Sequence, residues 1–199
     1  MEDIAIIGAG GHTLVIIDII NETKKYNIIG LYDDVKTGIF YGHKILGKIK
    51  DINKNTKNYI IGIGNNNVRK KIFEQYKDLN WCKLIHPKAI ISNTANIKSG
   101  TVICAGAIVQ PYVEIGSHCI INTNSNIDHQ SNISNFVSVC PGVTICGNVN
   151  IGTLSFIGAN STIIQNLNIG SNTIIGAGSV IIKAVDCNKK IVGNPGKYI

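Results

Sequence analysis

An aliphatic residue recurs at every sixth position through the second half of this 199-residue chain. From Ile91 to Ile181, all sixteen positions of the series hold Ile or Val. An amphipathic helix needs apolar spacings of three and four, which a strict spacing of six does not give. A flat sheet of hairpins would not keep a period of six residues, because its loops would interrupt the spacing. The repeat therefore predicts short strands joined by regular corners.

A second column of small or modestly apolar residues lies two positions before the series, for example at Ala107, Val137 and Ser161. Three strand-and-corner units close a triangular coil of about 18 residues, and stacked coils bury the aliphatic column. Residues 91–181 therefore predict about five coils of a parallel β-helix.

The residue after a series member is often Gly, Asn or Asp, as at Gly116, Gly152 and Gly158. These residue types tolerate the positive φ that a tight corner needs. We therefore expect the corners of the coil to form directly after the inward aliphatic residues.

The first half of the chain has a different pattern, in which short apolar runs end in glycine or acidic residues. We expect strands at 3–7, 27–32 and 59–63 and helices at 13–20 and 68–76. This order is typical of a small parallel, Rossmann-like α/β sheet, whose ligands bind at the carboxyl ends of the strands. The chain thus divides into an α/β unit over residues 1–88 and a β-helix over residues 89–199, with a closing loop at its C-terminal end.

Composition narrows the choice of ligand and location. Residues 1–88 contain 14 Lys and Arg against 9 Asp and Glu, so this half either attracts phosphorylated small molecules or has an ordinary solvated surface. Aromatic residues do not interleave with the basic ones, which argues against nucleic acid. The six cysteines form no metal-binding motif and are expected to be mainly small buried hydrophobes. Without a signal peptide or an apolar run of about 18 residues, we expect a cytoplasmic protein that does not insert into membranes.

The repeat resembles that of the hexapeptide-repeat acyltransferases, whose β-helix is left-handed. Three features of the first half narrow the resemblance to one subfamily: a glycine-rich turn ending in His12, the pair Asp33–Asp34, and the run from Ile63 to Asn66. This subfamily contains N-acetyltransferases of nucleotide-linked 4-amino-sugars and the enzymes called sialic-acid O-acetyltransferases. Membership would imply acetyl-CoA as co-substrate, no metal, and a homotrimer with donor sites between neighbouring prisms.

The resemblance also implies roles for residues of the α/β unit, which would hold the nucleotide-sugar. Gly10, Gly11 and His12 would lie near its phosphates or sugar, Asp33 and Asp34 on the nucleoside, and Gly64 at the strand end. The alternatives without ligand binding are that Gly10 and Gly11 form a packing turn and that the two aspartates form a simple turn.

For the chemistry, the run from Asn122 to Gln130 matches the subfamily stretch that carries a catalytic histidine, here His129. An imidazole titrates near neutral pH and suits a general base. Gln130 stands where the subfamily commonly has Glu or Asp, so it can orient the ring without bringing a negative charge. The residues implied at the acyl donor are Ser138, Gly147, Ala159 and Ala177, and Ser138 replaces a histidine that is frequent in the subfamily.

These features predict an acetyltransferase that acts on the amino group of a nucleotide-linked 4-amino-sugar. An O-acetyltransferase of sialic or related acids is the main alternative, although a hydroxyl would depend more on the carboxylate that is missing at position 130. A prism that binds sugar nucleotides without catalysis is a further alternative. A zinc carbonic anhydrase is disfavoured, because the repeats contain only His118 and His129 and the metal needs three histidines.

Overall fold

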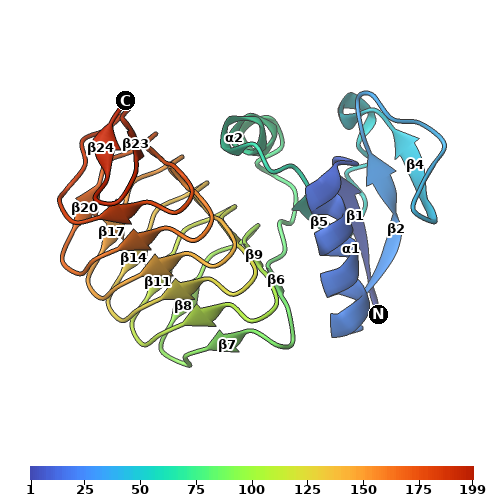
Figure 1. The fold of residues 1–199 in the computed structure, drawn as a ribbon. Helices are drawn as coiled ribbons and strands as arrows, with labels where there is room; N and C mark the ends of the chain where they lie inside the picture. Colours follow the sequence, from blue (N-terminus) through green and yellow to red (C-terminus); the bar gives the residue numbers. More distant parts are fainter.

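A computed structural model describes all residues, 1–199, as an α/β unit followed by a β-helix (Figure 1). The α/β unit has one sheet in the order β3-β4-β2-β1-β5, in which only β3 is antiparallel. Its elements are β1 (Glu2–Ile7), α1 (Gly11–Thr23), β2 (Tyr26–Tyr32), β3 (Ile39–Phe40), β4 (His43–Gly47), the short 3₁₀ helix η1 (Ile49–Asp51), β5 (Asn58–Ile61) and α2 (Asn66–Gln75). Neither helix is both long and apolar enough to cross a membrane.

The three predicted strands and two predicted helices are all present, but the hairpin β3–β4 was not foreseen. Its first strand has only two residues, and its turn places Tyr41 and Gly42 at φ values of 44° and 83°. Tyrosine is not a usual turn residue, so the sequence offered little sign of this hairpin. The hairpin adds a parallel neighbour to β2 and extends the sheet on the side of Asp33 and Asp34.

Three parallel sheets form the faces of the β-helix, and each strand pairs with the strand one coil away. The first face contains β7 (Ile90–Ile91), β10 (Ile108–Val109), β13 (Asn126–Ile127), β16 (Thr144–Ile145), β19 (Thr162–Ile163) and β22 (Val180–Ile181). The second contains β8 (Asn96–Ile97), β11 (Glu114–Ile115), β14 (Asn132–Ile133), β17 (Asn150–Ile151) and β20 (Asn168–Ile169). The third contains β6 (Leu84–Ile85), β9 (Val102–Ile103), β12 (Ile120–Ile121), β15 (Ser138–Val139), β18 (Phe156–Ile157), β21 (Ile174–Ile175), β23 (Lys190–Val192) and the antiparallel β24 (Lys197–Tyr198).

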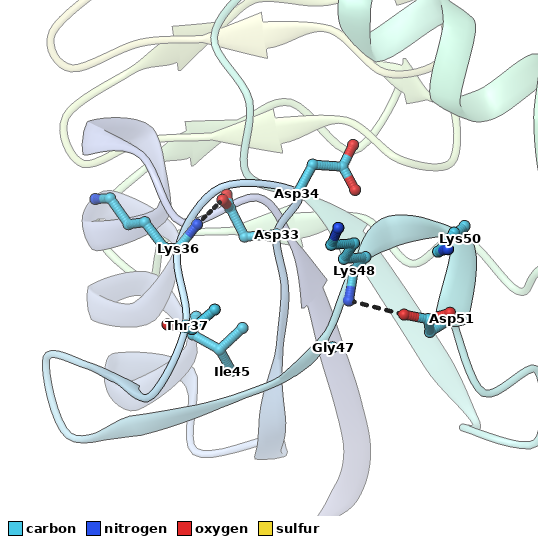
Figure 2. Close-up of a pocket in the computed structure, with 9 residues that line it drawn as sticks. All are labelled: Asp33, Asp34, Lys36, Thr37, Ile45, Gly47, Lys48, Lys50 and Asp51. Carbon is cyan, nitrogen blue, oxygen red and sulfur yellow. Dashed lines mark hydrogen bonds between the residues drawn. The ribbon is translucent and has the colours of Figure 1, made fainter.

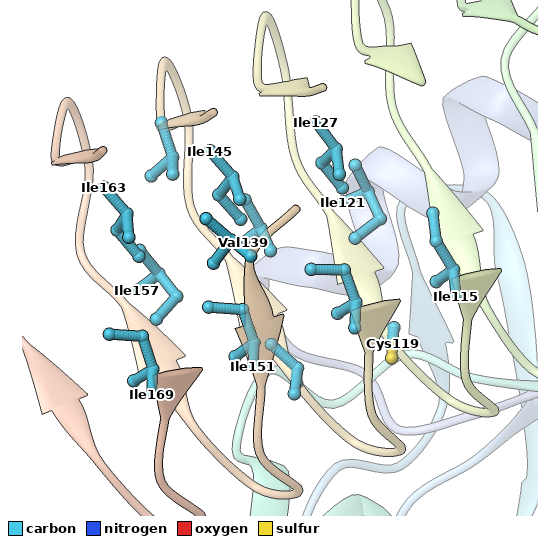
Figure 3. Close-up of a cluster of buried hydrophobic side chains, with 14 of the residues drawn as sticks. Ile115, Cys119, Ile121, Ile127, Val139, Ile145, Ile151, Ile157, Ile163 and Ile169 are labelled. Atoms are coloured by element: carbon cyan, nitrogen blue, oxygen red, sulfur yellow. The ribbon is translucent and has the colours of Figure 1, made fainter. Parts of the chain in front are cut away.

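The predicted fold class, an α/β unit followed by a left-handed parallel β-helix, is confirmed. The aliphatic series fills the interior, and its members from Ile103 to Ile175 are at most 2% exposed. Figure 3 shows this column, with side chains from all three faces meeting inside the coils. Strand β6 already pairs with β9, so the third face of the β-helix starts at Leu84.

The corners lie two residues later than predicted. Positive φ values occur at every sixth position from Gly100 to Gly178, three residues after each series member from Ile97 to Ile175, for example at His118 and Asn160. The glycines that directly follow the series have another role, because they lie against the backbone of the next coil. A Cβ at Gly158 would stand 2.5 Å from the amide nitrogen of Ala177, and one at Gly152 would stand 2.4 Å from that of Ser171.

The α/β unit packs on the third face of the β-helix. Val102 and Cys104 on this face share one apolar cluster with Ile4 and Ile16 of the α/β unit. Helix α2 lies along the corner that carries His118, Phe136 and Leu154, which are stacked one coil apart and which we call the docking corner. The two units therefore form one continuous body.

His118 is fully buried in an aromatic cluster at the docking corner. Its ring stacks on Phe136 at 5.5 Å and meets Phe73 of α2 at 4.6 Å and Trp81 at 5.1 Å. Neither ring nitrogen has a hydrogen-bond partner. Burial, with a smaller contribution from the Arg69 cation, lowers the pKa of His118 to about 4. The imidazole is therefore neutral and packs against its neighbours as an aromatic ring.

We expect Gly158→Ala to lower the free energy of unfolding by about 1–3 kcal/mol, because the new Cβ pushes two coils apart. The matched control is Gly178→Asn, at a corner where φ is +67° and where a Cβ meets no atom within 4 Å. Asn160 and Asn172 already adopt this conformation, so the control should change stability by less than about 0.5 kcal/mol. Urea titration followed by circular dichroism measures both, and equal losses would contradict the assignment of close contact to Gly158.

His118 should make the fold sensitive to acid. Its pKa is lower in the folded chain than in the unfolded chain, so stability is lost as the pH falls from about 6.5 to about 4. We expect His118→Phe to remove up to about 3 kcal/mol of this loss, since Phe136 shows that the corner accepts phenylalanine. Unfolding curves at pH 7.5 and pH 4.5 give the comparison, and the same loss in both proteins would exclude His118 as its source.

Candidate functional site

The glycine-rich turn after β1 leaves open space at the N-terminus of α1. A Cβ placed on Gly10, Gly11 or Gly64 would meet no atom within 4 Å, whereas Cβ atoms at Gly8 and Gly62 would overlap Ile63 and Thr13. Packing therefore explains Gly8 and Gly62 but not Gly10, Gly11 and Gly64. The first turn of α1 carries no acidic residue, so its free N–H groups and positive dipole end suit an anion.

Asp33 joins this turn to the end of β2. Its carboxylate accepts the backbone N–H groups of Ala9 at 2.7 Å, Val35 at 2.9 Å and Lys36 at 2.8 Å, while the Lys36 ammonium donates to the Ala9 carbonyl at 2.7 Å. Partial burial opposes ionisation, but these N–H groups and the Lys36 charge outweigh it and lower the pKa of Asp33. Asp33 is thus a fixed anion that shapes the loop.

A polar hollow of about 310 Å³ opens beside this loop, as Figure 2 shows. Asp33 and Asp34 line it together with three lysines that sequence reasoning missed, Lys36, Lys48 and Lys50. Asp34 accepts the Ile49 N–H at 3.0 Å and so connects the loop to η1. The lysines lie in segments without a recognisable motif: Lys36 belongs to the Asp33 loop, whereas Lys48 and Lys50 reach the hollow from the end of β4 and from η1.

His12, in the first turn of α1, has a buried Nε2 without a hydrogen-bond partner. Burial, with a smaller contribution from the Arg69 cation, lowers the pKa of His12 to about 4. The side chain therefore offers a neutral ring at the same carboxyl edge of the sheet as Gly10 and Gly11.

His129 lies on a second corner of the β-helix, beside a groove of about 520 Å³. Residues from three successive coils line this groove, among them Asp128 and Gln130, Gly147, and Gln165. The ring Nδ1 lies 3.2 Å from Gln130 Oε1, and Nε2 lies 3.8 Å from Asp128 Oδ2. Asp128 also accepts the backbone N–H of His129 at 2.8 Å. The ring is thus flanked on both sides by oxygen acceptors.

Gly147 stands one coil above His129 and makes room for its ring. A Cβ at this position would lie 2.6 Å from Cε1 and 2.8 Å from Nε2 of His129. The backbone of Gly147 does not have a positive φ, so contact with the ring, and not strain, explains the glycine. Its N–H donates no hydrogen bond within the chain and is free to bind a ligand beside the imidazole.

The other donor residues predicted from sequence do not join this groove. Ala159 and Ala177 are stacked on a third corner, one coil apart, where Pro141 precedes them in the stack. Ser138, the remaining residue predicted at the acyl donor, is only 4% exposed, and its hydroxyl hydrogen bonds with Asn66 and Arg69. It belongs to the contact between the two units and does not line the groove of His129.

Three comparisons place the chain among known proteins. Residues 3–76 match the PglD N-terminal domain family. The acetyltransferase domain of PglB from Neisseria gonorrhoeae is 31% identical and superposes over 100% of both chains with a TM-score of 0.96. A variant of perosamine N-acetyltransferase from Caulobacter crescentus, in complex with CoA and GDP-perosamine, is 25% identical with a TM-score of 0.95 over 100% of this chain and 97% of its own.

Among curated proteins, UDP-N-acetylbacillosamine N-acetyltransferase of Bacillus subtilis is 37% identical over 115 residues, which cover 53% of this chain and 52% of that protein. The chain thus spans about half or less of the length of the curated relatives it matches. The PglB domain, by contrast, is matched from end to end, through both the α/β unit and the β-helix. The chain therefore belongs to the family of hexapeptide-repeat acetyltransferases that includes the PglB domain.

Proposed function

We propose that this protein transfers an acetyl group from acetyl-CoA to the amino group of a nucleotide-linked 4-amino-sugar. The observation that carries the proposal is the pairing of the His129 imidazole with the free Gly147 N–H in one open groove. A base and an N–H donor side by side are what acyl transfer to an amine requires. The PglB domain, whose structure in complex with acetyl coenzyme A has a TM-score of 0.95 to this chain, supports the choice of donor.

The acceptor would bind at the carboxyl edge of the α/β sheet. Gly10, Gly11 and Gly64 leave room there, and the N-terminus of α1 attracts phosphate. His12 adds a neutral ring beside the sugar or its phosphates, while Asp33, Asp34 and the neighbouring lysines form the hollow for the nucleoside. The names of the Bacillus and Caulobacter relatives, which refer to UDP- and GDP-linked amino-sugars, support this class of substrate.

His129 would act through Nε2. Gln130 Oε1 is an acceptor and therefore favours a proton on Nδ1, which leaves Nε2 unprotonated. As the amine nitrogen attacks the thioester carbon, Nε2 takes the amine proton and the carbonyl electron pair moves to oxygen, where the Gly147 N–H stabilises it. The intermediate then collapses, the carbon–sulfur bond breaks, and the CoA thiolate takes the proton from His129.

Asp128 would partly replace the carboxylate that Gln130 lacks. Its Oδ2 lies on the Nε2 side of the ring at 3.8 Å, close enough to stabilise the imidazolium that forms during transfer. Both side chains are about half exposed, at 56% and 47%, so the pair contributes less than about 1 kcal/mol in the free protein. This modest assistance suits an amine acceptor better than a hydroxyl, because an amine is the stronger nucleophile.

A homotrimer would complete both the acyl-donor site and the nucleotide-sugar site. Within one chain, α2 covers the docking corner, whereas His129 and the pair Ala159 and Ala177 lie on the other two corners. The acyl donor would therefore bind between the corner of His129 in one copy, the histidine corner, and the corner of Ala159 and Ala177 in the next copy, the alanine corner. A closed ring of identical contacts provides this arrangement three times. The six free cysteines fit a reducing compartment and support a cytoplasmic location.

Thiol release from acetyl-CoA tests the proposal directly. We expect turnover with one of the UDP-, GDP- or dTDP-linked 4-amino-sugars, and His129→Ala should reduce kcat by at least about 100-fold. Free sialic acid serves as the competing acceptor. Turnover with sialic acid alone would replace the proposal by O-acetylation, and no turnover with any acceptor would contradict an enzymatic role.

Gly147→Ala should impair catalysis without unfolding the protein. The equivalent corner positions Ala159 and Ala177 carry alanine, so the backbone accepts it, but the new methyl group would displace the His129 ring. We expect stability to change by less than about 0.5 kcal/mol, because the exposed ring can swing outward, and kcat to fall at least about tenfold. A full kcat would show that the position of the ring beside Gly147 does not matter.

A further inference from the structure

Arg69, in the middle of α2, is a buried cation at the contact between the two units. It is 1% exposed, and none of the ion pairs in the structure includes it. Burial lowers its pKa to about 10, so the guanidinium is still charged at neutral pH. An unpaired buried charge is costly unless hydrogen bonds compensate it. The neighbours of Arg69 must therefore supply that compensation.

The neighbours of Arg69 compensate its charge with hydrogen bonds from both units. On the α/β side, Nη1 donates to the carbonyls of Ile63 at 3.2 Å and Gly64 at 2.7 Å, directly after β5. On the β-helix side, Nε donates to the His118 carbonyl at 3.1 Å and Nη2 to the Phe136 carbonyl at 3.4 Å. One side chain thus ties the carboxyl edge of the sheet to two coils of the docking corner.

Asn66 and Ser138 complete this cluster. Asn66 Oδ1 accepts from Arg69 Nη2 at 2.9 Å and from the Ser138 hydroxyl at 2.7 Å. Its Nδ2 donates to the carbonyls of Leu154 and Ser155, both at 3.0 Å, which brings in a third coil. Ser138 in turn accepts from Arg69 Nη2 at 3.2 Å. Every polar side-chain atom of Asn66 and Ser138 is used inside the protein.

The cluster determines where Gly64 stands. Gly64 is exposed, faces open space, and immediately precedes the N-cap of α2 at Asn65. Its carbonyl is held by the shortest hydrogen bond that Arg69 makes. A change in the cluster would therefore move the carboxyl edge of the α/β sheet, where the nucleotide-sugar is proposed to bind. The groove of His129 lies on a different corner and would stay in place.

We propose that Arg69 is a positioning residue for the nucleotide-sugar site, and that Ser138 acts with it on sugar-nucleotide binding and not on acetyl-CoA binding. This inference rests on the proposed function, because it assigns the acceptor to the edge at Gly64. It gives Ser138 a role different from the donor-site role that the resemblance to the subfamily implied.

The test separates the two Michaelis constants. We expect Arg69→Met to raise the KM for the sugar nucleotide at least about tenfold, and Ser138→Ala to raise it about threefold to tenfold, each with less than a twofold change in the KM for acetyl-CoA. Arg69→Lys keeps the charge and should recover part of the loss. Lys71→Met is the matched control, since it removes an exposed cation from the same helix. A rise in the KM for acetyl-CoA, or equal effects of Arg69→Met and Lys71→Met, would overturn the inference.

Calorimetry with UDP, GDP and dTDP gives a readout that does not depend on turnover. If Arg69→Met fails to fold, Ser138→Ala and Arg69→Lys carry the same comparison. Weaker nucleotide binding by these variants supports the inference even when no amino-sugar is acetylated, a result that would contradict the proposed function alone. Unchanged nucleotide binding in the folded variants, or no binding by the unaltered protein, would overturn the inference.

Discussion

Successive coils of the β-helix lie one strand spacing apart, about 4.8 Å, and the arrangement at every corner follows from that distance. Where the chain passes close to the next coil, as at Gly158, only glycine fits. Where a large side chain projects from one coil, the residue one coil later must be small, and glycine at position 147 leaves space for the His129 ring. The same spacing that stabilises the stack therefore places an imidazole next to a free backbone N–H. Structure and chemistry share one geometric cause.

This regularity explains which parts of the molecule the sequence could predict. Because the period is six, the aliphatic series determines which residues point inward and places His129 and Gly147 in the same stack. The corner positions were placed two residues early, because glycine serves close contact in this fold as well as positive φ. The side on which α2 packs has no periodic signal. Arg69 stands among three consecutive basic residues, and only its spacing of three from Asn66 and Ile72 marks it as buried.

The contact between the units combines two kinds of burial. Apolar side chains such as Val102 and Ile4 supply the non-directional part, which scales with buried area. Arg69, Asn66 and Ser138 supply a directional part, since their hydrogen bonds reach particular carbonyls of the docking corner. A buried charge adds little net stability, because desolvation offsets its attractions. Its value here is orientation: the carbonyls at residues 118 and 136 define one position for the loop at Gly64.

A triangular prism offers three corners, and this chain uses each for a different contact. The docking corner holds the α/β unit, the corner of His129 holds the proposed base, and the third corner carries Ala159 and Ala177, the residues proposed for the acyl donor. Because α2 covers the docking corner and His129 lies on another corner, the proposed homotrimer would bring the nucleotide-sugar site of one copy to the His129 of a neighbouring copy. Association of copies would therefore be a condition of catalysis, and not only a source of stability. The precision of such a site depends on how rigidly each α/β unit is held to its prism, which is the task that the structure assigns to Arg69.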